Sequence, residues 1–439
     1  MEQLFRVGKE EELRFEVEEG WLGKIQITSG TGEVFGVQCA LNRAYELGVG
    51  KYAVFSWHGC EVVLSGTSLL ASPKTAGPTS NAYAKDASLS MVCNMNVHIK
   101  LEHDREQASL KKQPGVGGPI TMIVGPTDSG KSTTARTLCA YAVRRGRQPC
   151  LVDLDPGQND LTIPGAMAAT ICSSIESSIS VEHGVQMGQH PLVEFYGYIS
   201  PSDGPEAYKR AVEQLADTVS KRVDASCSGT IINTCGYVEG PGYALLLDCI
   251  TKFKPTLVLV MGQDLLQNKL KKNVAEMQFP HVCDVVKVPI SGGATTRNQE
   301  FRKRNRNRKI REYFYGSKPD TAPLTSSSIE LSFDQVNVVR VPNKDDNTLS
   351  SMRPVGKASA LDPNLPRPVD LVPALLQNSV VAVSFAEEEA QVLTSNVAGF
   401  VHIQSVDVEH RTLTVLSPQK GPLPGKFLVM GGVKWVDGG

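Results

Sequence analysis

The stretch GPTDSGKSTT, residues 125–134, has the spacing G-x-x-x-x-G-K-[ST] that is typical of loops binding nucleotide phosphates. In such a loop, successive backbone N–H groups surround the β-phosphate, helped by the positive end of the helix that follows. Lys131 would lie between the β- and γ-phosphates, and the Ser132 hydroxyl can bind Mg²⁺. The residues predicted to bind phosphate are Asp128, Ser129, Gly130, Lys131, Ser132 and Thr133.

Two acids in the segment LVDLDPGQND could serve phosphate transfer. Asp153 and Asp155 are two residues apart, so both can point to one side at the carboxyl end of a strand, where ligands bind in α/β sheets. One acid can hold Mg²⁺ or its water, and the other can orient or deprotonate an attacking hydroxyl. Gln158 and Asn159 follow in the same turn and can contact the acceptor. The alternative is a pair of solvated acids in a turn.

The segment INTCGYVEGPGY, residues 232–243, ends another strand in a polar, glycine-rich turn. Thr234 can sense the γ-phosphate, and Tyr237 can stack on a base. A turn of no special role is an equal alternative.

Basic residues concentrate late in the chain. Eight of the fifteen residues from 297 to 311 are Arg or Lys, and only Glu300 opposes them. Arg297, Arg302 and Arg306 recur at spacings of five and four, which can share a helix face. Because the whole chain has a net charge of only −1, this concentration indicates a polyanion nearby. A solvated basic helix or a nuclear-import signal is the alternative.

A fifth motif lies too far along the chain to act with the phosphate loop. Residues 343–346, NKDD, fit the guanine-reading pattern N-K-x-D, but they lie about two hundred residues past the phosphate loop, in an expected linker. GTP is therefore not favoured.

The surrounding elements indicate three domains. With 439 residues, of which 41% are hydrophobic, the chain can form two or three buried cores. Up to about residue 97, alternating segments such as ELRFEVE predict an antiparallel β domain over 1–100. Strand–helix alternation from Pro119 predicts a phosphate-loop domain with a doubly wound parallel sheet over 101–316. Strand-like segments after a linker at about 343–368 predict a small β-rich domain over 317–439. The fold class is α/β.

The composition indicates in which cellular compartment the chain works. Ten scattered cysteines without metal-ligand spacing predict free thiols, several of them buried, in a reducing compartment. The first residues lack the apolar run of a secretory signal, and no run approaches the length of a membrane helix. We therefore expect an intracellular chain with no membrane partner.

In order, these motifs resemble the eukaryotic polynucleotide 5′-hydroxyl kinases that are also subunits of the pre-mRNA cleavage factor. The resemblance extends along the whole chain. It rests on ELRFEVE, AVFSWHG, GPTDSGKST, the D-x-D-x-GQ turn, INTCG, SGG followed by the spaced arginines, IREYFYG and SVDVEHRTLTVLSP.

The resemblance implies an ATP- and Mg²⁺-dependent kinase acting on RNA 5′ ends. It implies that the N-terminal domain completes the adenine site with Glu12 and Lys51, and that Asp155 activates the RNA hydroxyl. It implies that three arginines form a lid over the phosphates and the RNA, namely Arg297, Arg302 and Arg306. It further implies a nuclear location, a large scaffold partner in the cleavage factor and, in animals, association with the tRNA splicing endonuclease.

Two residues depart from the active pattern. Active animal members carry Trp where this chain has Tyr237, and Thr where it has Ile199. Some fungal members hold ATP without catalysis. Two hypotheses therefore stay open, an RNA kinase and an ATP-bound scaffold without turnover. A related kinase family of ribosomal-RNA processing shares the D-x-D-x-GQ turn, but the end-to-end match argues against it.

Overall fold

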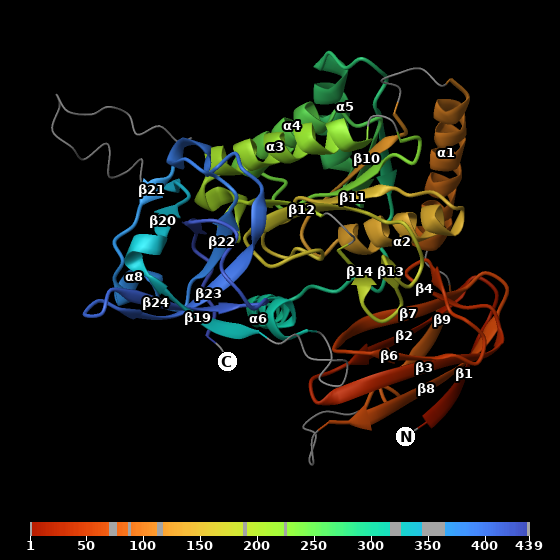
Figure 1. Cartoon of the computed structure of the whole chain (residues 1–439). Helices are drawn as coiled ribbons and strands as arrows, with labels where there is room; N and C mark the ends of the chain where they lie inside the picture. The colour runs from red at the N-terminus through yellow and green to blue at the C-terminus, as the bar shows by residue number, and fades with distance from the viewer. Residues whose placement is uncertain are drawn as a thin grey trace.

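Three units follow one another along the chain in the computed structural model, which describes residues 2–69, 77–86, 89–111, 117–187, 191–223, 226–316, 326–344 and 365–436. An N-terminal β-sandwich, a central α/β unit and a C-terminal β-rich unit lie around helix α6 (Gln299–Tyr315) (Figure 1). This arrangement confirms the predicted fold class. Most of the expected linker at about 343–368, including Asp345 and Asp346, lies outside the described residues.

The N-terminal unit is a sandwich because its strands alternate apolar and polar residues. Its two antiparallel sheets have the orders β1-β8-β3-β6 and β5-β4-β7-β2-β9. Leu13, Phe15 and Val17 of β2 belong to the apolar core of this unit. The strands are β1 (Glu2–Val7), β2 (Glu11–Val17), β3 (Trp21–Gly30), β4 (Glu33–Val34), β5 (Val37–Gln38), β6 (Ala44–Leu47), β7 (Gly50–Ser56), β8 (Cys60–Ser68) and β9 (Tyr83–Asp86).

Helix α1 (Leu89–Lys111) corrects the prediction that strand-like segments continue to about residue 97. The predicted domain boundary at residue 100 falls within this helix. Its buried face is largely polar, because Arg105 is 1% exposed and donates to Glu102 Oε1 at 2.6 Å and to Ser228 O at 2.9 Å. Hydrophobic periodicity therefore gave no signal for it.

The central sheet combines parallel and antiparallel strands in the order β15-β12-β11-β16-β10-β17-β18. The five strands from β11 to β18 are parallel, as predicted, whereas β12 and β15 add an antiparallel edge that was not predicted. The strands are β10 (Ile120–Val124), β11 (Cys150–Asp153), β12 (Ala166–Ile171), β15 (Leu192–Phe195), β16 (Thr230–Asn233), β17 (Leu257–Met261) and β18 (Asp284–Val288), and β13 (Ile179–Ser180) with β14 (Gly184–Val185) forms a separate ladder.

Helices cover both faces of this sheet (Figure 1). The helices α3 (Pro205–Val223), α4 (Pro241–Phe253) and α5 (Asp264–Glu276) pack on one face. Helix α2 (Lys131–Arg144) packs on the other face, between the sheet and the N-terminal unit. Glu33 of β4 fixes this contact by accepting hydrogen bonds from Tyr141 and Arg144 of α2.

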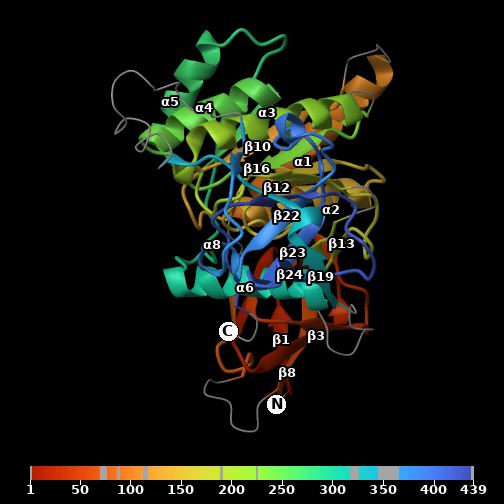
Figure 2. The same cartoon turned by 60° about the vertical axis from the view of Figure 1, so that its left-hand side comes forward.

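The C-terminal unit is a sheet of order β19-β24-β23-β22-β25-β20-β21 with α6 against it. Phe314 near the end of α6 stacks on Trp435 with ring centroids 5.7 Å apart. Both views place α6 beside these strands and next to the N-terminal unit (Figures 1 and 2). The elements are β19 (Ser327–Ser332), β20 (Asn337–Arg340), β21 (Arg367–Pro368), α8 (Pro373–Leu376), β22 (Val380–Ser384), β23 (Val397–Asp407), β24 (Thr412–Ser417) and β25 (Phe427–Met430), with short 3-10 turns at Pro201–Asp203, Phe333–Gln335 and Glu389–Gln391.

All ten cysteines are free thiols, and six of them are buried. None of the helices in the described ranges is long and apolar enough to cross a membrane.

His98 makes the stability of this core sensitive to pH. Burial, together with the charges of Arg105, Arg145 and Arg144, lowers its pKa from 6.5 to about 4, although Glu102 opposes the shift. Below pH 6.5 the unfolded chain therefore binds a proton that the folded chain refuses, so stability falls as the pH drops towards 4. We expect His98→Gln to lose several degrees less in melting temperature than the natural chain between about pH 7.5 and about pH 5. Equal losses in thermal denaturation would contradict this.

Candidate active site

Three strand ends meet at one edge of the central sheet. Parallel pairing aligns Asp153 of β11 with Asn233 of β16, and β10 ends beside them at Val124. The predicted phosphate loop follows Val124 directly and leads into α2 at Lys131. The loop, the acidic turn and the INTCG turn are therefore neighbours, because parallel strands bring their carboxyl ends to the same edge.

The loop backbone has the form of an anion cradle. Gly125, Asp128 and Gly130 have positive φ angles of 156°, 61° and 87°. No side chain of the described residues caps the N-terminus of α2, so its first N–H groups remain available for a phosphate. Residues 127–134 line a cavity of about 440 Å³, which is large enough for a nucleotide.

Lys131 binds its own loop. Its Nζ donates to Gly125 O at 3.0 Å and to Pro126 O at 2.7 Å, and the residue is 7% exposed. Burial lowers the pKa of this ammonium, and Asp155 and other nearby acids oppose the shift. A nucleotide phosphate would compete with these two carbonyl oxygens for the ammonium.

Asp153 is buried behind the loop and is not among the described residues that line the cavity. Its Oδ1 accepts from Asn233 Nδ2 at 2.9 Å and from Asp155 N at 3.1 Å, and its Oδ2 accepts from Asp160 N at 2.9 Å. Burial, together with the negative charges of Asp160 and Asp155, raises the pKa of Asp153 to about 8. The residue orders the turn that follows β11.

The surroundings of Ser132 fit Mg²⁺. Asn233 Nδ2, which donates to Asp153, also donates to Ser132 Oγ at 3.2 Å. The Ser132 hydroxyl and the Asp153 carboxylate therefore both contact the side-chain amide of Asn233. Asn233 Oδ1 is buried and has no hydrogen-bond partner among the described residues. These residues include no group of three or more His, Cys, Asp or Glu able to hold a metal. Oxygen donors of this kind suit Mg²⁺ that shares its coordination with phosphate oxygens.

Asp155 lies at the cavity wall. Its Oδ1 accepts from Gly157 N at 2.9 Å and from Gln158 N at 3.0 Å, which fixes the carboxylate in the turn. Burial raises its pKa, against these two donors and the charge of Lys131. Ile199 lies beside this turn, since a Cβ on Gly157 would be 2.5 Å from Ile199 O.

The N-terminal unit supplies the opposite wall of the cavity. Glu12 and Lys51 lie on the paired strands β2 and β7 and both line it. Glu12 is 3% exposed, and its Oε1 accepts a hydrogen bond from Arg14 Nε at 2.9 Å. Lys51 Nζ lies 3.4 Å from a carboxylate oxygen of Glu16. Sequence reasoning alone did not select Arg14, whose one signal is a charged residue between the apolar Leu13 and Phe15.

The predicted lid lies against the phosphate loop. Arg297 N and Arg302 Nη2 both donate to Asp128 Oδ2, at 2.9 and 2.7 Å. The prediction that Arg297 shares a helix face with the other two arginines is wrong, because Asn298 caps α6 by accepting from Phe301 N. Burial lowers the pKa of Arg306, Arg302 lowers it further, and Asp155 opposes the shift.

A side chain and a backbone oxygen of the acidic turn hold the lid helix. Gln158 Nε2 donates to Arg302 O at 3.4 Å, and Gln158 Oε1 accepts from Asn305 Nδ2 at 3.2 Å. Lys309 Nζ donates to Asp160 O at 3.2 Å. Gln158 therefore contacts the lid in this structure as well as lining the cavity.

Thr234 and Tyr237 are not among the described residues that line the cavity. Thr234 is 2% exposed, and its Oγ1 donates to Ile123 O at 2.8 Å. The Tyr237 ring packs on α4, because a Cβ on Gly242 would be 2.4 Å from it. Their roles toward substrate stay predictions.

Three family models match the chain in succession. They are described as the N-terminal beta-sandwich domain of polyadenylation factor, over residues 6–108, the mRNA cleavage and polyadenylation factor CLP1 P-loop, over 125–316, and pre-mRNA cleavage complex II protein Clp1, over 324–437. The polyribonucleotide 5′-hydroxyl-kinase Clp1 of Homo sapiens is 37% identical over 443 residues, covering 99% of this chain and 96% of that protein. This chain belongs to the Clp1 family.

Other Clp1 proteins agree with this assignment. The protein CLP1 homolog of Arabidopsis thaliana is 37% identical over 441 residues, covering 98% of this chain and 94% of that one. A solved structure of the wild-type Clp1p–Pcf11p complex has a TM-score of 0.82 with 24% identity, and the match covers 99% of this chain and 98% of that one. At that identity the likeness to the solved structure concerns the fold alone.

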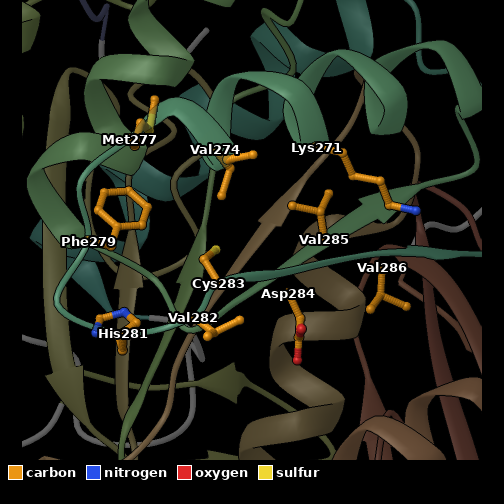
Figure 3. A pocket seen from close by; sticks show the side chains of 11 residues that line it. Lys271, Val274, Met277, Phe279, His281, Val282, Cys283, Asp284, Val285 and Val286 are labelled. Carbon is orange, nitrogen blue, oxygen red and sulfur yellow. The ribbon is translucent and has the colours of Figure 1, made fainter.

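A second cavity of this Clp1-family chain lies elsewhere, at the β18 edge of the central sheet. Its volume is about 480 Å³, and side chains from α5, from β18 and from the loop between them line it (Figure 3). Most of the residues that line it are apolar, but Lys271, His281 and Asp284 add polar groups, and His281 Nε2 is hydrogen-bonded to Lys254 O at 2.9 Å. It has no phosphate loop and shares no described residue with the first cavity.

Gly236 of the INTCG turn packs closely against Thr127 of the phosphate loop. A Cβ there would be 2.4 Å from Thr127 Oγ1 and 2.5 Å from Thr127 N. We expect Gly236→Ala to displace the loop and to weaken ATP binding about tenfold, the order of effect that overpacking produces. Titration calorimetry measures this, and Gly48→Ala is the control because a Cβ there meets nothing within 4 Å. Unchanged affinity in Gly236→Ala would show that the loop does not depend on this contact.

Proposed function

We propose that this chain is an ATP-dependent polynucleotide kinase that transfers the γ-phosphate to the 5′-hydroxyl of RNA. The observation that carries the proposal is the position of Asp155, on the wall of the cavity that the phosphate loop also lines. An acid there can reach a hydroxyl that approaches the terminal phosphate. The names of relatives such as the human polyribonucleotide 5′-hydroxyl-kinase Clp1 support the same activity.

The residues divide the chemistry among them. Asp155 would accept the proton of the attacking hydroxyl, and the raised pKa that burial gives it suits a general base. Lys131 and the loop N–H groups would hold the phosphates, and Arg302 and Arg306 would stabilise the charge of the transferring group. Ser132 and Asp153 would hold Mg²⁺, which supplies charge neutralisation on the β- and γ-phosphates.

The base would bind against the N-terminal unit. Glu12 offers a buried carboxylate that can accept a hydrogen bond from the adenine amino group, and Lys51 lies at the same wall. The carboxylate would repel the O6 of guanine, so this wall favours ATP over GTP.

The proposal includes a place in RNA processing. The family descriptions name the mRNA cleavage and polyadenylation factor, and Clp1p has been solved in complex with Pcf11p, which supports a scaffold partner in the cleavage factor. A nuclear location and, in an animal cell, association with the tRNA splicing endonuclease rest on the family resemblance.

A catalytically silent ATP-bound scaffold is the second candidate. The packing of Tyr237 on α4 favours it, because Tyr237 is not among the described residues that line the cavity. In that role ATP would stabilise the fold by binding to the native state only.

The deciding experiment follows transfer of labelled phosphate from ATP to an RNA oligonucleotide with a 5′-hydroxyl. We expect transfer by the natural chain, none by Lys131→Ala, and transfer slower by about a thousandfold in Arg302→Ala, with ATP still bound, because arginines of this kind contribute that order of rate. Intact bound ATP without transfer by the natural chain would favour the scaffold. Normal turnover in both variants would exclude this mechanism.

A further inference from the structure

Asp128 is an acid inside a loop built to bind anions. Its carboxylate would lie beside the phosphates of a bound nucleotide, and its negative charge would weaken their binding. Its φ of 61° lies in the left-handed region, which Asp and Asn tolerate better than other side chains. The side chain is 13% exposed, so it is not a solvated surface acid.

The contacts of this carboxylate are with the lid. Oδ2 alone accepts two hydrogen bonds, from Arg297 N at 2.9 Å and from Arg302 Nη2 at 2.7 Å. These donors lie on either side of Asn298, the N-cap of α6. One carboxylate therefore holds both the start of the lid helix and the guanidinium one turn further along.

Arg302 keeps a donor unused. Its Nε is buried and has no hydrogen-bond partner among the described residues. Because the guanidinium is planar, a hydrogen bond from Nη2 to Asp128 fixes the direction of the Nε–H bond as well. Arg302 is not among the described residues that line the cavity, so this donor would meet an oxygen of the transferring phosphoryl group only when the lid moves onto a bound nucleotide.

We propose that Asp128 is a positioning residue, whose carboxylate aligns Arg302 and the first turn of α6 with the phosphoryl group that is transferred. The proposal rests on the kinase function proposed above. Asp128 then weakens ATP binding slightly and improves alignment in the transition state. These two effects have opposite signs on affinity and on rate, so kinetics can separate them.

The test is a double-mutant cycle on the full chain, with kcat and the Kd for ATP measured for each variant. Asp128→Asn is the chosen change because Asn keeps the size and tolerates the left-handed backbone. We expect kcat to fall about tenfold or more while ATP binds as tightly or more tightly, and we expect Asp128→Asn combined with Arg302→Ala to be no slower than Arg302→Ala alone. Glu300→Gln, an exposed acid on the lid without contact to Asp128, is the control and should leave both constants unchanged.

Two outcomes would overturn the proposal. One is weaker ATP binding with unchanged kcat, which would make Asp128 a structural part of the loop. The other is a double variant whose loss equals the product of the two single losses, which would make the two residues independent.

Hydrogen exchange without nucleotide separates this inference from the kinase function. The Arg297 N–H donates to Asp128, so we expect it to exchange about tenfold faster in Asp128→Asn than in the natural chain. Faster exchange in Asp128→Asn, with no phosphate transfer by the natural chain, would contradict the kinase function but support the contact between Asp128 and Arg297. Unchanged exchange in an active kinase would reject the contact.

Discussion

Every candidate group of the central unit depends on the parallel pairing of β11, β16 and β10. This pairing brings Asp153, Asn233 and the phosphate loop to one edge, although about a hundred residues separate the loop from Asn233. The amide of Asn233 then joins Ser132 to Asp153. A shift of one residue in this register would turn every side chain of the shifted strand to the other face of the sheet and separate these groups.

The ionisable groups at that edge are held away from water. Burial raises the pKa of Asp153 and Asp155 and lowers that of Lys131, because the loss of water disfavours the charged form of each group. Electrostatic attraction is stronger in such a setting than in water, and hydrogen bonds from the turn backbone keep the two acids in place. The two acids are therefore in place before a nucleotide arrives, and such preorganisation makes electrostatic stabilisation effective. Lys131, in contrast, would have to exchange its two loop carbonyls for phosphate oxygens.

The fold class and the place of the phosphate loop followed from sequence because strand–helix alternation and glycine spacing are local signals. Other features are long-range and have no such signal. The buried face of α1 is polar, so periodicity did not identify a helix before residue 97. Glu12 and Arg14 are only two positions apart on β2, but Arg14 packs beside the distant Gly292 and Gly293. The contact of Asp128 with Arg302 joins residues 174 positions apart. The antiparallel strands β12 and β15 also lacked a distinctive pattern.

Helix α6 contacts the C-terminal unit at one end and the phosphate loop at the other. Phe314 is fully buried against Trp435, whereas Arg302 lies near the first turn. The helix segment between them is about 18 Å long, so a rotation of about 10° around the buried end would move the guanidinium by about 3 Å. The helix would thus act as a lever, and a partner that shifts the C-terminal unit slightly would change the reach of Arg302 at the other end of the helix.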